Sequence, residues 1–297
     1  MIDKKKYLNP STVARLGNIK LRARMAVEGY LAGQHKSPYH GFSVEFAEHR
    51  SYGTGDEIRH IDWKLYAKTD RFYVKRFEEE TNLRSYIILD TSKSMDYGSG
   101  SITKLNYAIH LSAALTHLML AQRDGMGLIL FDEKINKFIP PRASPSHANY
   151  IMSALGKILT GSDTKIKPTL DRMAEKIKKR GMVIVISDLL DEPSEVLMGL
   201  NHFRHNKQEI IVFHIIDKEE KEFSFSSRTK FKDLETGELI TTDPWHIRSD
   251  YINNFNSIQK IYKKGCRNQK IDYVPLYTNN SLNDALGQYL KKRQKIS

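Results

Sequence analysis

Ser85-Tyr-Ile-Ile-Leu-Asp90-Thr-Ser92-Lys-Ser94-Met95 is the stretch that decides the fold of this 297-residue chain. Its apolar run, Tyr86 to Leu89, is short and continuous, as in strands that a parallel sheet buries on both faces. An aspartate ends the run, and two serines follow at alternate positions. In open α/β sheets, ligands bind outside the carboxyl ends of the strands, where the strand order reverses. The stretch therefore predicts a central strand that brings Asp90, Ser92 and Ser94 to a ligand-binding edge.

The three polar side chains of this turn are hard oxygen donors, one carboxylate and two hydroxyls. Mg²⁺ prefers such donors in octahedral geometry and usually keeps some of its waters. The turn therefore indicates a divalent metal site. The alternative is that Asp90 caps the next helix and the serines bind amides of the loop.

Strand and helix patterns alternate from Arg84 onward. The predicted strands are 85–90, 127–131, 135–139 as an antiparallel edge, 182–187, 209–216 and 271–276. The predicted helices are 104–122, 146–159, 168–180, 193–204, 245–264 and 281–293. Such alternation predicts an α/β fold, with a mostly parallel sheet, helices on both faces and right-handed crossovers.

Two parts of the chain depart from this alternation. Residues 1–80 are predicted to be an N-terminal extension packed on the main domain, 81–297, because they have little apolar content for a core of their own. The extension shows a helical pattern from about 9 to 31, an ordered loop with short strands and a strand at 72–79. In the main domain, Thr236-Gly237 between two short strand patterns predicts a hairpin insertion near 222–244.

The composition predicts a cytoplasmic protein. With 40% hydrophobic and 28% charged residues, the chain can bury a core and present a charged surface. No apolar run reaches the roughly 18 residues of a membrane span, and the polar start lacks the apolar region of a secretory signal. Cys266 is the only cysteine, which excludes an intramolecular disulfide and fits a reducing compartment.

The formal charge of +12 raises the question of an anionic partner. The basic clusters at 176–180, 263–264 and 291–293 fall at the ends of predicted helices, where cations complement the helix dipole. This distribution argues against a nucleic-acid surface and favours an acidic protein partner.

Two further polar residues extend the Asp90 turn. Asp188 ends the strand 182–187 as Asp90 ends the first strand, and Thr164 lies in the loop after Gly161. This order, Asp-x-Ser-x-Ser, then a loop threonine, then a strand-end aspartate, resembles the metal-ion-dependent adhesion site of the von Willebrand factor A-like fold.

The resemblance implies a metal site made of Asp90, Ser92, Ser94, Thr164 and Asp188. It implies that the hydroxyls bind Mg²⁺ (or Mn²⁺ or Ca²⁺) directly, that the aspartates act partly through water, and that one coordination position stays open for a partner's carboxylate. The threonine loop here departs from the frequent Gly-Gly-Thr. Thr160 and Thr169 are therefore alternatives for the threonine, and Asp191 is a possible extra acid.

A second stretch narrows the family. It reads Gly41-Phe42-Ser-Val-Glu45-Phe46-Ala-Glu48-His-Arg50-Ser-Tyr52, then Gly55-Asp56-Glu-Ile-Arg59-His-Ile61-Asp62-Trp63-Lys64. This resembles the signature of a bacterial family of von Willebrand A-like proteins labelled a domain of unknown function, number 58, whose members accompany MoxR-type AAA+ ATPases. The resemblance implies a non-enzymatic, metal-dependent adaptor or chaperone-like protein that works with such an ATPase and with its client proteins.

The signature stretch has two readings of its own. Its charged residues can form a network that pins irregular backbone onto the sheet, with Trp63 as the apolar anchor. The other reading is a docking surface, since loops often carry binding residues.

Other chemistry finds little support in the sequence. A strand-end aspartate also begins haloacid dehalogenase-type phosphatases, but the second acid that they need is replaced by Ser92. The stretch from Gly98 to Lys104 lacks the glycine that a phosphate loop places before its lysine. We therefore expect neither an enzyme nor a small-molecule substrate, and keep a metal-dependent, phosphatase-like hydrolase using Asp90 as the alternative.

Overall fold

The structure is a computed structural model that describes residues 43–53, 61–80, 83–121, 123–158, 166–225, 227–232 and 237–282. The chain divides into two compact units, one formed by 35–83 and the other by 1–34 together with 84–297. The predicted helix at 9–31 and all but the start of the one at 281–293 lie outside the described residues. The packing of the extension on the main domain stays a prediction.

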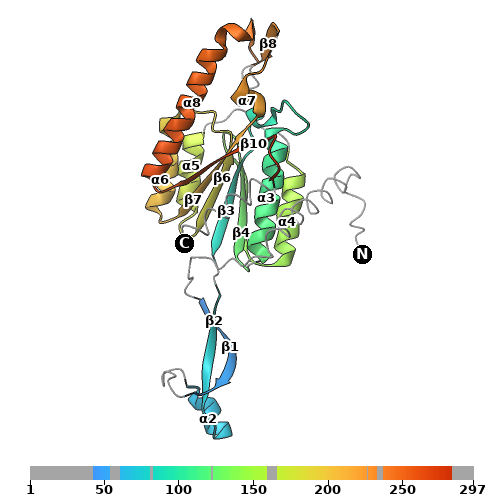
Figure 1. The fold of residues 1–297 in the computed structure, drawn as a ribbon. Helices are drawn as coiled ribbons and strands as arrows, with labels where there is room; N and C mark the ends of the chain where they lie inside the picture. The colour runs from blue at the N-terminus through green and yellow to red at the C-terminus, as the bar shows by residue number, and fades with distance from the viewer. Residues whose placement is uncertain are drawn as a thin grey trace, which may run out of the picture. The chain divides into compact units, whose positions relative to one another are not determined.

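The larger unit is built on a six-stranded sheet with the order β10-β7-β6-β3-β4-β5 (Figure 1). Its strands are β3 (Arg84–Asp90), β4 (Gly125–Phe131), β5 (Ile135–Arg142), β6 (Met182–Ser187), β7 (Glu209–Ile216) and β10 (Asp272–Tyr277). All neighbours pair in parallel except β4 and β5, which are antiparallel. This confirms the predicted mostly parallel α/β sheet with an antiparallel edge.

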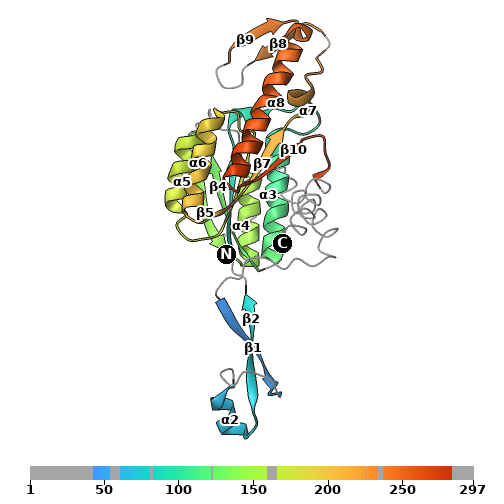
Figure 2. The ribbon, with the colours of Figure 1, turned by 60° about the vertical axis from the view of Figure 1, so that its left-hand side comes forward.

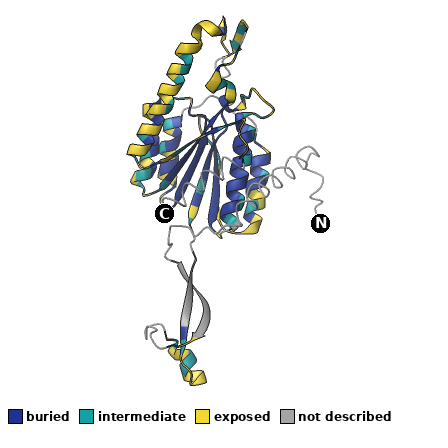
Figure 3. Ribbon diagram, viewed as in Figure 1, coloured by how far each residue is buried: buried dark blue, intermediate teal, exposed yellow. Residues whose placement is uncertain are grey.

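Helices cover both faces of the sheet, α3 and α4 on one and α5, α6 and α8 on the other (Figures 1 and 2). They are α3 (Lys104–Ala121), α4 (Pro145–Gly156), α5 (Ile166–Lys176), α6 (Pro193–His205) and α8 (Pro244–Asn268). Along α8, side chains on one face of its C-terminal half, among them Tyr262 and Cys266, join the core, while most of the helix is exposed (Figure 3). No helix among the described residues is both long and apolar enough to cross a membrane.

The central strands are buried on both faces, as the apolar run in β3 predicts. Ile87, Ile88 and Leu89 have no exposed surface, and every residue of β4 and β6 is buried (Figure 3). Burial of continuous apolar strands between two helical layers supplies the main driving force for this architecture.

The order of strands reverses between β3 and β6. From β3 the chain moves outward to β4 and β5, then returns to β6 on the other side and continues to β7 and β10. At such a switch point the crossovers leave the sheet on opposite faces and open a crevice at the carboxyl ends. Asp90 and Asp188 lie at the ends of these two neighbouring strands.

The predicted hairpin is present as β8 (Thr229–Lys232) and β9 (Leu239–Thr242), beside the N-terminal end of α8 in both views (Figures 1 and 2). Gly237 has a φ of 77°, a region that glycine enters without steric cost. Before the hairpin, the sequence did not predict the short helix α7 (Lys218–Glu222). This helix forms one turn, and a capping box of Asp217 and Glu220 starts it.

The smaller unit contains an antiparallel pair, β1 (Ser43–Ser51) and β2 (Tyr73–Glu80), and the helix α2 (Trp63–Thr69). β2 was predicted, whereas α2 was not. Trp63 is 56% exposed within this unit, and its role as the anchor of the signature stretch on the sheet stays a prediction. Asp62 caps α2 by accepting bonds from the backbone N–H groups of Lys64 and Leu65, which leaves Trp63 as the first helical residue, facing outward.

Candidate functional site

Asp90 is the last residue of β3 and is fully buried. Its Oδ1 accepts the backbone N–H of Ser92 at 3.0 Å, and its Oδ2 accepts the hydroxyl of Ser187 at 2.6 Å. Burial, and then the negative charge of Asp188, raise the pKa of Asp90 to about 7, although these two hydrogen bonds oppose the rise. The carboxylate thus lies in a place where a bound cation would stabilise its charged form.

Ser92 and Ser94 place two hydroxyls beside this carboxylate. Ser92 precedes the short 3₁₀ helix η3 (Lys93–Asp96) with extended backbone, and both serines are buried. Their Oγ atoms lie 3.0 Å apart. The turn therefore gathers a carboxylate and two hydroxyls at one strand end, as the sequence predicts.

This donor set fits a small divalent cation. Two neighbouring oxygen ligands of an octahedral Mg²⁺, each bound at about 2.1 Å, lie about 3.0 Å apart. The hydroxyls of Ser92 and Ser94 have this separation. The described residues contain no cluster of three His, Cys, Asp or Glu side chains that could hold a metal ion. A site here would therefore depend on hydroxyl oxygens, which suit hard cations such as Mg²⁺.

Asp188 meets a different partner. Its Oδ2 accepts a bond from the ammonium of Lys104 at 2.7 Å, and the same ammonium donates to Oε1 of Glu220 at 2.5 Å. Lys104 has no exposed surface. Burial alone would lower the pKa of Lys104, but the charges and hydrogen bonds of Asp188 and Glu220 outweigh it and raise that pKa. Lys104 therefore stays charged and neutralises Asp188 from within the protein.

Lys104, Glu220 and Ser187 are site residues that the sequence analysis missed. Lys104 begins a long apolar helix, and a lysine on the buried face of such a helix is a usable signal, because buried lysines need a paired acid. Glu220 carried no such signal, since it reaches the site from a helix that was not predicted.

The structure places the other predicted residues as follows. Thr164 and its alternative Thr160 lie outside the described residues, so their role stays a prediction. The other alternative, Thr169, donates its hydroxyl to the backbone oxygen of Glu133. Asp191, the possible extra acid, accepts the backbone N–H of Ile166 and thereby caps the start of α5.

Comparison with known proteins finds similar chains that cover most of this sequence. The uncharacterized protein Rv1480 of Mycobacterium tuberculosis is 23% identical over 248 residues, which cover 82% of this chain and 77% of that protein. A crystal structure of the conserved hypothetical protein BatB from Bacteroides thetaiotaomicron is 19% identical, with a TM-score of 0.46, and covers 71% of this chain and 98% of that one. The SpRpn10 VWA domain is 14% identical, with a TM-score of 0.39, and covers 69% and 95%.

The larger unit has an α/β fold, with a mostly parallel six-stranded sheet and a small separate hairpin. A family model described as "Protein of unknown function DUF58" matches residues 48–260. This match spans the signature stretch from Glu48 onward, the Asp90 turn, Asp188 and most of α8. The chain belongs to this family of proteins of unknown function.

Proposed function

We propose that this protein is a non-enzymatic, metal-dependent interaction protein that binds an acidic residue of a partner at the carboxyl edge of its sheet. The observation that supports this most directly is the pair of buried hydroxyls of Ser92 and Ser94, 3.0 Å apart beside the buried carboxylate of Asp90. Three oxygen donors converge at the switch point of the sheet, the position where ligands of such sheets bind.

In this proposal, the two serine hydroxyls and Asp90 hold Mg²⁺. The bound ion supplies an electrophilic centre with a position that a partner's carboxylate can fill. Ser187 and the backbone of Ser92 keep Asp90 in place through their hydrogen bonds. Lys104 cancels the charge of Asp188, which leaves the edge with fewer net negative charges to compete with an incoming carboxylate.

We further propose that the partner is a MoxR-type AAA+ ATPase, that client proteins are a third component, and that the assembly works in the cytoplasm. The resemblance of the signature stretch supports the ATPase. The net charge of +12 favours acidic surfaces during approach. A reducing compartment fits the single, buried cysteine, Cys266.

The geometry of Asp90 disfavours the hydrolase alternative. A nucleophilic aspartate must present an oxygen to the substrate. Here the residue is fully buried, and each of its carboxylate oxygens accepts a hydrogen bond from a protein group. An interaction role needs only that the carboxylate supports the ion.

The test is an interferometry assay with an immobilised MoxR-type AAA+ ATPase from the same organism. We expect binding in Mg²⁺ that weakens at least tenfold in EDTA and in Ser92→Ala. Ser144→Ala is the matched control, because Ser144 and Ser146 also form a hydroxyl pair, 3.1 Å apart, but on the exposed start of α4. Equal affinity in Mg²⁺ and EDTA would contradict a metal-dependent interface. Turnover of a phosphoester by the wild type that Asp90→Ala abolishes would instead support the hydrolase.

A further inference from the structure

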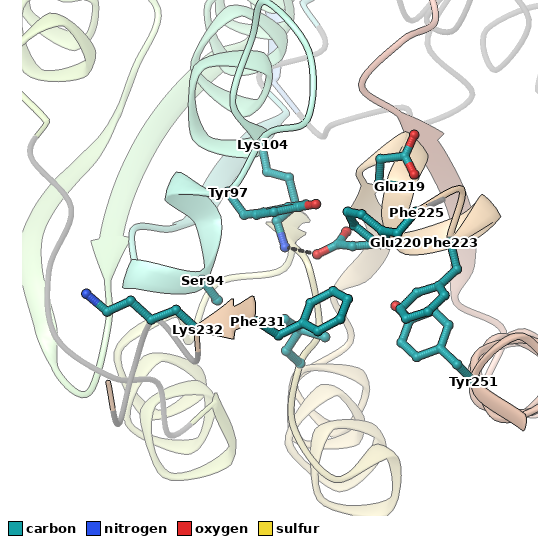
Figure 4. Close-up of a pocket in the computed structure, with 11 residues that line it drawn as sticks. Ser94, Tyr97, Lys104, Glu219, Glu220, Phe223, Phe225, Phe231, Lys232 and Tyr251 are labelled. Atoms are coloured by element: carbon teal, nitrogen blue, oxygen red, sulfur yellow. Dashed lines mark hydrogen bonds and ion pairs between the residues drawn. The ribbon is translucent and has the colours of Figure 1, made fainter. Parts of the chain in front are cut away.

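A cavity of about 410 Å³ adjoins the candidate metal site, and Ser94 forms part of its wall (Figure 4). Five aromatic rings line it, those of Tyr97, Phe223, Phe225, Phe231 and Tyr251. They come from the loop after η3, the end of α7 and its following loop, the hairpin strand β8, and α8. The volume lies within the range of about 300–1,000 Å³ that is usual for ligand sites.

The rings support one another. Phe223 stacks on Tyr251 with centroids 4.4 Å apart, and Phe225 meets Phe231 edge-on at 5.1 Å. Phe223 and Phe231 are also stacked, at 5.7 Å. Such mutual contacts hold the rings in fixed positions around the cavity. Aromatic faces carry negative electrostatic potential, so a wall of this kind attracts cations as well as apolar groups.

The charged groups around the cavity add to this potential. Glu219 and Glu220 both line it. The buried group of Asp188, Lys104 and Glu220 has one positive and two negative charges, so its sum is negative, and Glu219 adds to it. The lysine Lys232 also lines the cavity, but in Figure 4 its amino group points away from the rings.

Two observations show how the wall treats charge. The ammonium of Lys104 lies 5.8 Å from the centre of the Tyr97 ring, so the wall already places one cation near an aromatic face. Burial, and then the charges of Asp217, Glu220 and Glu219, raise the pKa of Tyr97 to about 12. In a chain with a net charge of +12, this cavity is thus a local acidic and aromatic exception.

We propose that this cavity binds a cationic side chain, an arginine or a lysine, of the partner protein that docks at the carboxyl edge. Long basic side chains bury an apolar stem and present a charged head, which suits aromatic walls with carboxylates among them. Because Ser94 belongs both to the metal site and to the cavity wall, the partner would present an acidic and a basic side chain close together. The proposal rests on the proposed function for the identity of the partner, but not for the chemistry of the cavity.

The experiment uses small probes and the full chain, with calorimetry or ligand-observed NMR as the readout. N-acetyl-arginine amide is compared with N-acetyl-citrulline amide, which has nearly the same shape but no charge. We expect the arginine probe to bind at least tenfold more tightly than citrulline, equally in Mg²⁺ and in EDTA. Equal affinities for the two probes, or no binding by either, would overturn the cavity proposal.

Substitutions in the cavity wall test whether the arginine probe binds there. Phe231→Leu and Tyr251→Leu keep apolar volume but remove the aromatic faces, and Glu219→Gln removes one charge. Each should weaken the arginine probe several-fold. The controls are Phe138→Leu, at an exposed ring on β5, and Glu195→Gln, at an exposed acid on α6. Probe binding that none of the three cavity variants changes, in chains that melt as the wild type does, would place the site elsewhere and overturn the proposal.

A second probe separates this proposal from the proposed function. A blocked Asp-Arg dipeptide should gain affinity over the arginine probe in Mg²⁺ and lose that gain in EDTA. If the arginine probe binds but Mg²⁺ adds nothing for the dipeptide, the metal-dependent function fails and the cavity stands. If an Asp-citrulline dipeptide gains from Mg²⁺ as much as Asp-Arg and binds equally well, the function stands and the cavity proposal fails.

Discussion

Asp90 and Asp188 end neighbouring parallel strands of one sheet, yet their carboxylates meet different partners. Asp188 is paired with the buried ammonium of Lys104, which also holds Glu220. Asp90 accepts hydrogen bonds from neutral groups of Ser92 and Ser187, and among the described residues no lysine or arginine forms an ion pair with it. A buried carboxylate is costly unless a cation accompanies it. The protein thus supplies its own cation, Lys104, to Asp188. Asp90 has only neutral hydrogen-bond donors, and its surroundings suit the binding of an external cation.

The largest expected effect is on metal binding through Asp90. We predict that Mg²⁺ or Mn²⁺ binds with millimolar to micromolar affinity, which corresponds to about 4–8 kcal/mol, and that Asp90→Ala abolishes the calorimetric heat. Asp96→Ala is the control, because Asp96 is an exposed acid of the same turn. If metal titration of Asp90→Ala gives the same heat as the wild type, Asp90 is not a metal ligand. The contrast with Asp188 then does not reflect binding of an external ion.

Loss of the internal cation should destabilise the fold. Lys104→Met leaves the buried Asp188 and the partly buried Glu220 without their positive partner, a change that costs about 3–5 kcal/mol in the free energy of unfolding. Urea denaturation measures this. Lys167→Met, which removes an exposed contact with Glu195, should cost at most about 1 kcal/mol. Equal losses in the two variants would show that the buried triad contributes no more than a surface pair.

The raised pKa of Asp90 predicts a pH effect on the metal-free protein. In the folded chain this pKa is about 7, against an ordinary value of 3.8, so at a pH between these two values the folded state holds a proton that the unfolded state has released. The contribution of Asp90 to stability is therefore full below about pH 4 and is lost as the pH rises through 7. Asp90→Asn cannot lose a proton, so its stability relative to wild type should rise by about 2–3 kcal/mol from pH 5 to pH 8.

Thermal or urea unfolding at both pH values in EDTA measures this difference, and added Mg²⁺ should reduce it at pH 8. A difference between Asp90→Asn and wild type that is the same at pH 5 and pH 8 would mean that Asp90 is charged in both conditions. In that case, some other group of the protein would offset the cost of burying the charged carboxylate of Asp90.

The smallest effect concerns single hydroxyls. Ser92→Ala and Ser94→Ala should each weaken Mg²⁺ binding by about tenfold, close to 1.4 kcal/mol, because the carboxylate and the remaining hydroxyl still hold the ion. Ser144→Ala and Ser146→Ala should leave the calorimetric titration unchanged. Unchanged affinity in Ser92→Ala and Ser94→Ala would mean that these hydroxyls bond to each other, as the other pair does, and do not bind metal.

The fold was predictable to a large extent because its signals are local. The continuous apolar strands 85–90, 182–187 and 209–216 could be recognised without knowing their neighbours, and the structure confirms all three. The helix α7 was missed because one capped turn has no apolar period to detect. The helix α2 was missed because Asp62 starts it as an N-cap, a role that the charge of this residue alone did not reveal.

The sequence by itself determined that Asp90, Ser92 and Ser94 share one turn at the end of a buried strand, because their spacing along the chain leaves few other arrangements. Only the tertiary structure decided how their charges are compensated. Along the chain, 84 residues separate Lys104 from Asp188, and 116 residues separate it from Glu220. The crossovers of the sheet bring both acids within hydrogen-bond distance of the lysine. The same folding joins η3, α7, β8 and α8 around the aromatic cavity. Interactions between distant segments depend on the order of strands in the sheet. This order is set when the whole sheet packs, so it cannot be read from the residues of any single segment.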